Sequence, residues 1–195
     1  INFIITLIII IFIAFIEDRF DYIYLKRKKK INYKKKDLSK GYKKAQNSTI
    51  CICGLVRNCK EKLKKNSIYI EKIGSYFKDY KIVLFENDSD DGTREFLETW
   101  ENNNNKIILI KCPNNPKCKL KNKTGYGYGQ FSNTRIKKMA EYREQYLNYA
   151  KKINFDYTLV LDIDLDISSI NIEGLMHTLS KSDIWNGAFI NGRNN

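Results

Sequence analysis

Histidine is almost absent from this sequence, and the cysteines are odd in number and widely spaced. The 195 residues include one histidine, His177, and five cysteines. A zinc site needs cysteine or histidine pairs with about two to four residues between them. Because no such pairs occur, the sequence disfavours a zinc centre and favours cysteines buried in strands. A loop disulfide between Cys112 and Cys118 stays an alternative for an oxidising compartment. The five cysteines are Cys51, Cys53, Cys59, Cys112 and Cys118.

A glycine-rich phosphate-binding loop is also missing. The stretch Gly125-Tyr-Gly-Tyr-Gly follows a loop, not a strand, and matches neither the dinucleotide fingerprint nor the P-loop. Residues 112–131 hold this stretch and both prolines. We interpret them as a loop whose glycine-rich part forms a mobile lid over a site.

Positive charge is plentiful but confined to one part of the chain. The formal net charge is +13, and lysine and arginine dominate residues 26–44, where Asp37 is the one acidic residue. The remainder is nearly balanced. Basicity of a single segment does not indicate a nucleic-acid-binding fold, so we expect no nucleic-acid partner. The hydrophobic content of 43% is that of a folded domain.

The first sixteen residues are almost entirely apolar, slightly short of the roughly 20 residues that cross a bilayer. We expect residues 1–20 to form a membrane anchor or uncleaved signal, followed by a basic stem at residues 21–47 with little fixed structure. The stem could touch anionic lipid headgroups. A cleaved signal peptide and a buried core element are the alternatives.

The expected location is therefore a membrane, reached through a single N-terminal pass. In a eukaryote this would be the endomembrane system, such as the Golgi. The sequence leaves open on which side of the membrane the folded domain lies. The positive-inside rule places the basic stem in the cytoplasm, whereas a lumenal domain on a signal anchor needs the opposite orientation.

Apolar runs and helical periodicities alternate from residue 48 onward. This alternation is typical of an α/β fold with a doubly wound, mostly parallel sheet, so we assign residues 48–195 to one such domain. The predicted strands are 49–56, 80–85, 106–111 and 156–161, and the predicted helices are 60–78, a short one after Asp91-Gly-Thr, and one from Ser132 to about Lys151.

Polar residues follow three of the four predicted strands. Arg57 follows the first strand, and Glu86 and Asn87 follow the second. Parallel sheets bind ligands at the carboxyl ends of their strands. A carboxylate and an amide in this position can hydrogen-bond a nucleobase and a ribose. The Ser/Asp/Gly residues after Asn87 have a structural alternative, which is to cap the next helix.

Three aspartates, Asp162, Asp164 and Asp166, alternate after the fourth strand. In an extended segment, residues two apart lie on the same side. Their mutual repulsion calls for a cation, and Mg²⁺ or Mn²⁺ binds carboxylates while leaving positions for phosphate oxygens. We therefore predict a metal site at these three residues. A solvated strand end is the alternative.

Arg143 falls inside the apolar stripe of the long helix that ends near Lys151. The stripe consists of Ile136, Met139, Ala140, Leu147 and Ala150. A guanidinium on a buried face needs an anionic partner, such as the strand-end acids or a diphosphate. A snorkelling arginine, whose head reaches solvent, is the alternative.

These motifs resemble those of nucleotide-sugar-dependent glycosyltransferases of the GT-A type. Glu86-Asn87-x-Ser89-x-Asp91-Gly92-Thr93 resembles their DDGSxDGT turn, whose first acid contacts the nucleotide base. Asn87 stands where the second acid is usual. Asp162-x-Asp164 resembles the DxD motif, and Arg143 resembles the ARN element that precedes it.

A further segment narrows the resemblance. Asp183-Ile-Trp185-Asn186-Gly187-Ala188-Phe189 and Asn191-Gly192 are similar to the WDxxxANG segment of fungal capsule-associated mannosyltransferases and their protist and viral relatives. Asn186 stands where these relatives carry Asp. The resemblance covers about Thr49 to Asn195. Catalytic domains of this kind continue beyond the DxD region, so we expect the domain to be truncated at its C-terminus.

The resemblance implies a hexosyltransferase that uses Mn²⁺ or Mg²⁺ to move a sugar from a nucleotide-diphospho-sugar to a glycan or protein acceptor. Two alternatives remain: a nucleotidyltransferase that makes the sugar nucleotide, and a membrane-anchored basic binding module without catalysis. The residues expected to bind the nucleotide sugar are Arg57, Glu86, Asn87, Asp88, Arg143 and Asp162, and those expected to bind the metal are Asp162, Asp164 and Asp166.

Overall fold

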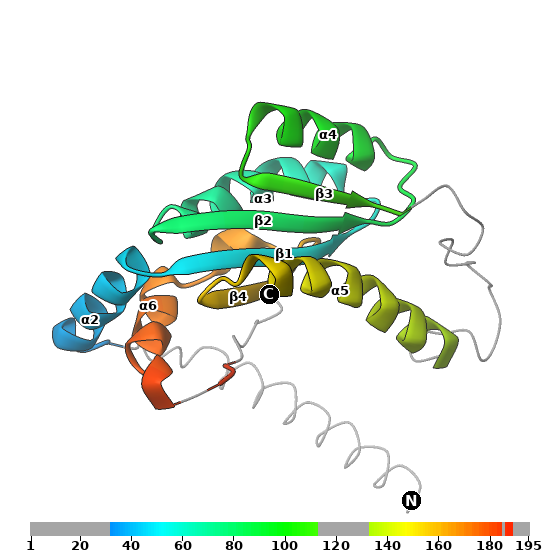
Figure 1. Cartoon of the computed structure of the whole chain (residues 1–195). Helices are drawn as coiled ribbons and strands as arrows, with labels where there is room; N and C mark the ends of the chain where they lie inside the picture. The colour runs from blue at the N-terminus through cyan, green and yellow to red at the C-terminus, as the bar shows by residue number, and fades with distance from the viewer. Residues whose placement is uncertain (1–31, 113–132, 185, 189–195) are drawn as a thin grey trace, which may run out of the picture. The chain divides into compact units, whose positions relative to one another are not determined.

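Four parallel strands form the centre of the fold, in the order β3-β2-β1-β4 (Figure 1). Every neighbouring pair is parallel, which confirms the predicted parallel sheet. The strand bounds agree with the predicted ranges to within one residue at each end. The strands are β1 (Thr49–Val56), β2 (Asp79–Glu86), β3 (Ile107–Lys111) and β4 (Tyr157–Asp162).

The computed structural model describes residues 32–112, 133–184 and 186–188. The described residues from Lys34 onward belong to one compact unit. Within these ranges no helix is long and apolar enough to cross a membrane. The predicted anchor at residues 1–20, the predicted lid around Gly125 and the end of the chain from residue 189 lie outside them.

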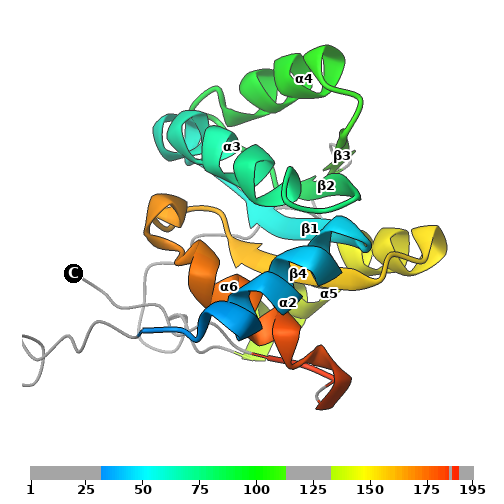
Figure 2. The same ribbon diagram turned by 90° about the vertical axis from the view of Figure 1, so that its left-hand side faces the viewer.

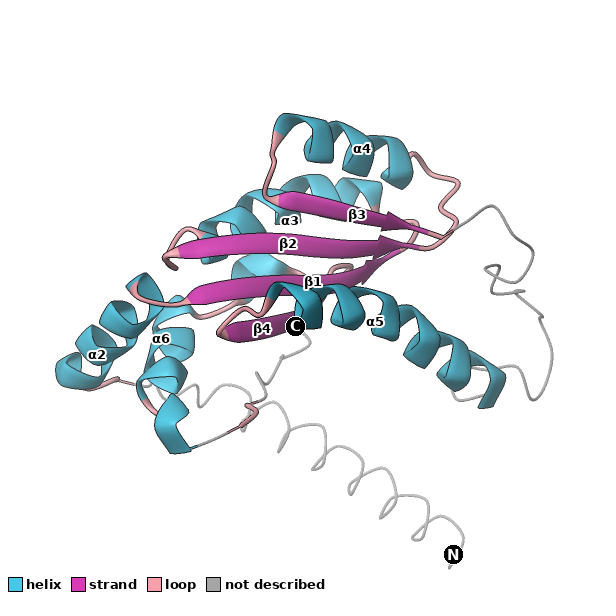
Figure 3. Ribbon diagram, viewed as in Figure 1, coloured by secondary structure: helices cyan, strands magenta, loops and turns pink. Residues whose placement is uncertain are grey.

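Helices cover both faces of the sheet (Figures 2 and 3), as expected for a doubly wound arrangement. The side chains of β1 show the division, because successive residues in a strand point to opposite faces. Ile50, Ile52 and Val56 join the core under α3, α4 and α6. Cys51 and Cys53 join the core under α5. These helices are α3 (Lys60–Gly74), α4 (Thr93–Asn103), α5 (Asn133–Ile153) and α6 (Ile172–Ser180).

The predicted basic stem is partly wrong, because residues 35–46 form a helix, α2 (Lys35–Gln46). Among its lysines, the helix carries an apolar stripe at helical spacing. Leu38, Tyr42 and Ala45 pack into the core under α6, and Gly41 lies against the backbone of Met176. The stripe therefore ties α2 to the folded domain.

The buried face of α5 also differs from the prediction. Tyr142, Tyr146 and Ala150 are buried, and they recur at four-residue spacing along the helix. Ile136 is 53% exposed, and Arg143 is exposed as well. Met139, Leu147 and Ala150 of the predicted stripe do pack in the core under α5. The buried face is centred on the two tyrosines, and Arg143 does not lie on it.

Candidate functional site

The carboxyl ends of β1, β2 and β4 bring the predicted polar residues to one edge of the sheet. The chain runs from β1 outward through β2 to β3 and then returns to the other side of β1 as β4. The direction of winding therefore reverses between β1 and β4. Ligands of open α/β sheets bind in the crevice outside the strands' carboxyl ends at such a point. Arg57 directly follows β1, and Asp162 ends β4.

The loops after β1 and β2 are joined by reciprocal hydrogen bonds. The amide of Asn58 donates to Ser89 Oγ at 3.0 Å, and the amide of Asp90 donates to Asn58 Oδ1 at 3.0 Å. Asn58 and Asp88 both adopt positive φ, at 45° and 52°. The two loops therefore form one connected frame at the edge of the sheet. Asp88, one of the predicted nucleotide-binding residues, is half-buried within it.

Asp91 completes this frame between the start of α3 and the start of α4. Its carboxylate accepts from the amides of Lys60 and Thr93 at 3.1 and 3.0 Å and from the Thr93 hydroxyl at 2.6 Å. Desolvation raises the pKa of Asp91, but these hydrogen bonds outweigh it and leave the pKa below its ordinary value. Gly92 follows at φ 86°, a conformation that favours glycine. The structural alternative, a capping turn, thus accounts for residues 89–93.

Glu86 and Asn87 lie on opposite faces of the sheet, because they are consecutive in an extended segment. Glu86 is fully buried on the face of α4. There its Oε2 accepts from Arg94 Nε at 2.6 Å, and its Oε1 accepts from the Ser89 amide at 2.7 Å. Both carboxylate oxygens thus have partners inside the fold. Glu86 holds the turn that follows β2 against α4.

Asn87 faces α5 and is 4% exposed. Its side chain hydrogen-bonds the hydroxyl of Tyr142, and its Oδ1 has no hydrogen-bond partner among the described residues. The amide nitrogen is therefore the donor to Tyr142. The Tyr142 ring stacks on Phe85 with ring centroids 5.2 Å apart. A buried carbonyl oxygen without a partner is costly unless a ligand or water supplies a donor.

Arg57 presents a second polar atom of this kind. Its Nε is buried and has no partner among the described residues, and its charge acts on the Tyr142 hydroxyl. Burial raises the pKa of Tyr142, while the charge of Lys138, the hydrogen bond from Asn87 and the charge of Arg57 oppose this shift. Within the described part of the chain, Asn87 thus offers an unpartnered acceptor and Arg57 an unpartnered donor, and both residues act on the hydroxyl of Tyr142.

Tyr146 lies one helical turn further along α5. It is buried at 1% exposure, and burial raises the pKa of its hydroxyl. The charge of Arg143 and a hydrogen bond with it oppose this shift, and the charge of Asp162 also reaches the hydroxyl. Arg143 and Asp162 therefore both lie near Tyr146. The structure brings Arg57, Asn87, Arg143 and Asp162 to the α5 side of the edge.

The acidic segment after β4 does not continue as a strand. The Leu165 amide donates to the Asp162 carbonyl at 3.2 Å, which closes a turn, and the short helix η2 (Ile167–Ser169) follows. The expected alternation of three carboxylates on one side is therefore wrong beyond Asp162. Among the described residues, no three acidic, cysteine or histidine side chains are grouped as a metal site.

Asp166 has a structural role at this turn. Its carboxylate accepts from the Ser168 amide at 3.1 Å, which caps η2, and Lys65 lies 3.8 Å away. The Ser168 hydroxyl, together with this amide and the charge of Lys65, lowers the pKa of Asp166. Asp162 and Asp164 are exposed, and neither carboxylate forms a hydrogen bond or ion pair with another described residue. The contacts of Asp166 all use its Oδ1, whereas both carboxylate oxygens of Asp162 and Asp164 are free of described partners.

The cysteines fit a structural role. Cys51 and Cys53 are buried side by side on β1, with their sulfurs 3.5 Å apart. Burial raises the pKa of the Cys59 thiol to about 11. Cys112 is disulfide-bonded, and Cys118, its expected partner, lies outside the described residues. Asp183, from the segment similar to WDxxxANG, pairs with Lys40 and Lys44 of α2.

Sequence reasoning missed Arg94, Tyr142 and Tyr146. The two tyrosines are four residues apart on the helix that precedes β4, and this spacing could have identified the buried face. No sequence pattern indicated Arg94, because its pairing with Glu86 depends on the face of the sheet to which Glu86 points. No protein-family model matches the chain, and no curated protein sequence matches it.

Proposed function

We propose that the chain carries the nucleotide-sugar-binding part of a metal-dependent glycosyltransferase of the GT-A type. The donor is a nucleotide-diphospho-sugar and the acceptor is a hydroxyl of a glycan or protein. The proposal is supported by the motif resemblance and by the strand order, in which the polar residues meet at the reversal point between β1 and β4.

One observation carries the proposal. Among the described residues, Asn87 Oδ1 and Arg57 Nε are buried polar atoms without a hydrogen-bond partner. Asn87 hydrogen-bonds the hydroxyl of Tyr142, and the charge of Arg57 acts on the same hydroxyl. A buried unpartnered acceptor and donor mark a place where a polar ligand completes the hydrogen bonding. A nucleoside diphosphate supplies both complements: N–H donors on its base or hydroxyls on its ribose, and phosphate oxygens for the guanidinium.

The division of roles follows from the two faces of the sheet. Glu86 keeps the turn in place through Arg94 and contributes no free oxygen. Asn87 therefore takes the contact to the nucleoside that the resemblance assigns to the first acid. Arg57 and Arg143 supply positive charge on the same side, where Asp162 also lies.

Two carboxylates fit the expected cation. Asp162 and Asp164 are exposed and free of described partners, and Mg²⁺ or Mn²⁺ uses one or two carboxylates together with phosphate oxygens. When bound, the cation neutralises the charge that develops on the diphosphate leaving group. Asp166 is left out of this set, since it caps η2.

The transfer itself breaks the bond between the anomeric carbon and the β-phosphate oxygen, whose electron pair leaves with the nucleoside diphosphate. The acceptor oxygen bonds to the anomeric carbon and releases its proton to a base. Residues of this chain hold the leaving group in this scheme: Asn87 orients the nucleoside, and the two arginines face the phosphates.

Product analysis separates this function from its enzyme alternative. The full chain, in detergent with Mn²⁺ and a panel of nucleotide sugars, is expected to release a nucleoside diphosphate. Release of a sugar phosphate and a nucleoside triphosphate upon addition of pyrophosphate would identify a nucleotidyltransferase instead. Absence of either product with every donor, while the salt-sensitive binding of a polyanion persists, would favour the basic binding module.

A further inference from the structure

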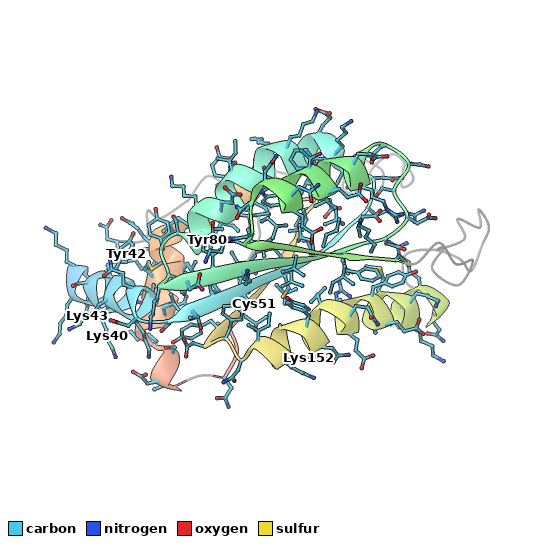
Figure 4. The ribbon with its side chains drawn as sticks, turned by 45° about the horizontal axis from the view of Figure 1, so that its top comes forward. Lys40, Tyr42, Lys43, Cys51, Tyr80 and Lys152 are labelled. Atoms are coloured by element: carbon cyan, nitrogen blue, oxygen red, sulfur yellow. The ribbon has the colours of Figure 1, made fainter. Side chains whose placement is uncertain are left out.

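The outer side of α2 carries a row of exposed lysines. Lys35, Lys36, Lys40 and Lys43 are exposed and recur at helical spacing on the side opposite Gly41 and Ala45, which are buried. We call these four lysines the basic face. In Figure 4, Lys40 and Lys43 extend from α2 away from the sheet.

Acidic side chains near α2 do not neutralise the basic face. Asp37 points to the α6 side, where Lys181 lies 3.2 Å away and His177 lies 3.7 Å away. Asp183 pairs with Lys40 and Lys44. Lys35, Lys36 and Lys43 form no ion pair with any described carboxylate. The face therefore keeps a net positive charge.

The basic face is fixed to the folded domain. The opposite side of α2 packs on α6, where an added Cβ at Gly41 would lie only 1.9 Å from the Met176 carbonyl oxygen. The end of α2 is joined to the sheet as well, because the Lys78 amide donates to the Ala45 carbonyl at 3.1 Å. Whatever binds the lysines therefore also sets the orientation of the sheet.

We propose that the basic face of α2 docks on the surface of an anionic phospholipid membrane. Lysine ammonium groups are attracted to phosphatidylserine-type headgroups within a Debye length of the surface. The sequence before α2 agrees with this partner, since further lysines stand at residues 28–30 and the apolar run at residues 1–16 is predicted to enter a bilayer. The proposal is independent of glycosyl transfer.

A membrane is favoured over nucleic acid as the partner. Proteins that bind single strands combine basic grooves with aromatic side chains on which bases stack. The one aromatic residue of α2, Tyr42, is half-buried against Tyr76, with ring centroids 5.9 Å apart. The exposed side of α2 thus offers charge without a stacking surface.

Docking through α2 gives the candidate site a defined position. α2 leads into the amino end of β1. Ser182, two residues after the end of α6, lies at the amino end of β4, where its hydroxyl is 2.9 Å from that of Tyr157. The candidate site lies at the opposite ends of these strands (Figure 1). An eight-residue strand is roughly 25 Å long at about 3.3 Å per residue. The site would therefore face away from the lipid surface.

The test places a fluorescent label on the basic face of the full chain. Ser39→Cys puts a thiol among the four lysines, and Thr99→Cys puts one on the exposed side of α4 as a matched control. The labelled chains are mixed with phosphatidylcholine vesicles that contain a headgroup quencher, with or without phosphatidylserine. Because the readout is local to α2, insertion of the N-terminal apolar run does not mimic it.

We expect quenching at position 39, and not at position 99, on vesicles that contain phosphatidylserine. Raised salt should reverse it. Replacing all four lysines by glutamine should weaken the docking on the order of a hundredfold or more, at about 1 kcal/mol, or roughly fivefold, per lysine near the surface. These lysines are exposed, so an unchanged thermal transition of the variant checks its folding.

Three outcomes would overturn the proposal. One is the absence of quenching at position 39 on anionic vesicles. The second is equal quenching on vesicles of phosphatidylcholine alone, and the third is unchanged quenching in the four-lysine variant. Lysine-dependent binding of an RNA oligonucleotide, with no quenching on anionic vesicles, would assign the basic face to nucleic acid.

Discussion

The guanidinium of Arg94 lies against the fully buried carboxylate of Glu86, with Nε 2.6 Å from Oε2. Glu86 ends β2, and Arg94 is in the first turn of α4. The pair therefore fixes the chain that connects the sheet to this helix. This chain segment includes Asn87, the residue whose unpartnered oxygen carries the proposed function.

Removing Arg94 should destabilise the fold strongly. Arg94→Ala leaves a buried carboxylate without its counter-charge, and breaking a buried pair in this way costs about 3–5 kcal/mol. Urea unfolding of the two proteins measures the loss. Glu98→Ala in the same helix removes the half-exposed partner of Lys111 and should cost less than about 1 kcal/mol. Equal effects of the two substitutions would show that the Glu86–Arg94 pair contributes no more than a surface pair.

Gly41 is expected to tolerate no side chain. Gly41→Ala would place a methyl group 1.9 Å from the Met176 carbonyl oxygen, so α2 and α6 must separate, at about 1–3 kcal/mol as for other overpacked contacts. Ser39→Ala, on the exposed side of the same helix, should stabilise the protein by about 0.3 kcal/mol through helix propensity. A stabilising Gly41→Ala would show that α2 does not pack on α6 in this way.

Asp91 should make the free energy of unfolding depend on pH in the acidic range. Its pKa is lowered in the folded state, so its contribution is present above the ordinary carboxyl pKa and is lost as the pH falls through the lower folded value. Asp91→Asn should lower stability near neutral pH by about 1 kcal/mol, as for other lost caps. The difference from the unmodified chain should shrink as the pH falls, which urea unfolding at several pH values can follow. A pH-independent difference would contradict the assignment.

Cys59 should be chemically inert in the folded protein. Its pKa of about 11 keeps the thiol protonated at pH 8, and the thiolate is the reactive form. Peptide mapping after brief iodoacetamide treatment should show Cys59 modified only in denatured chains. Its contribution to stability is present below the ordinary thiol pKa and is lost as the pH rises toward 11. Rapid modification of Cys59 in the native protein would exclude the buried position.

The fold was predictable because both faces of its sheet are covered, so each strand is a short apolar run in the sequence. Short apolar runs separated by helical periodicities define a parallel α/β sheet without further information. Helix α2 escaped prediction because its apolar residues, Leu38, Tyr42 and Ala45, are embedded among lysines and cover one side only. Such a helix can be identified only from the surface on which it packs, here α6, which lies far away in the sequence.

The site was predictable in its location and less so in its residues. Strand ends indicate where polar chemistry gathers, but the side on which a residue points depends on the register of each strand. The sequence predicts that Glu86 and Asn87 act together on one ligand, but the two side chains lie on opposite faces of the sheet. The spacing predicts Asp166 as a third metal ligand on the same side. In the structure β4 ends four residues earlier, and Asp166 Oδ1 caps η2.

Coupled binding of metal and nucleotide tests the central claim most directly. The full chain in detergent is titrated calorimetrically with nucleoside diphosphates, with and without Mn²⁺. We predict that each ligand tightens the other by the same factor, about 5–150-fold as in other coupled sites. Asp162→Asn should abolish the coupling, whereas Asp166→Asn, which alters the contacts of Oδ1 with Ser168 and Lys65, should preserve it. Nucleotide binding that ignores Mn²⁺, equal coupling in the two variants, or no binding of any nucleoside diphosphate would contradict the account.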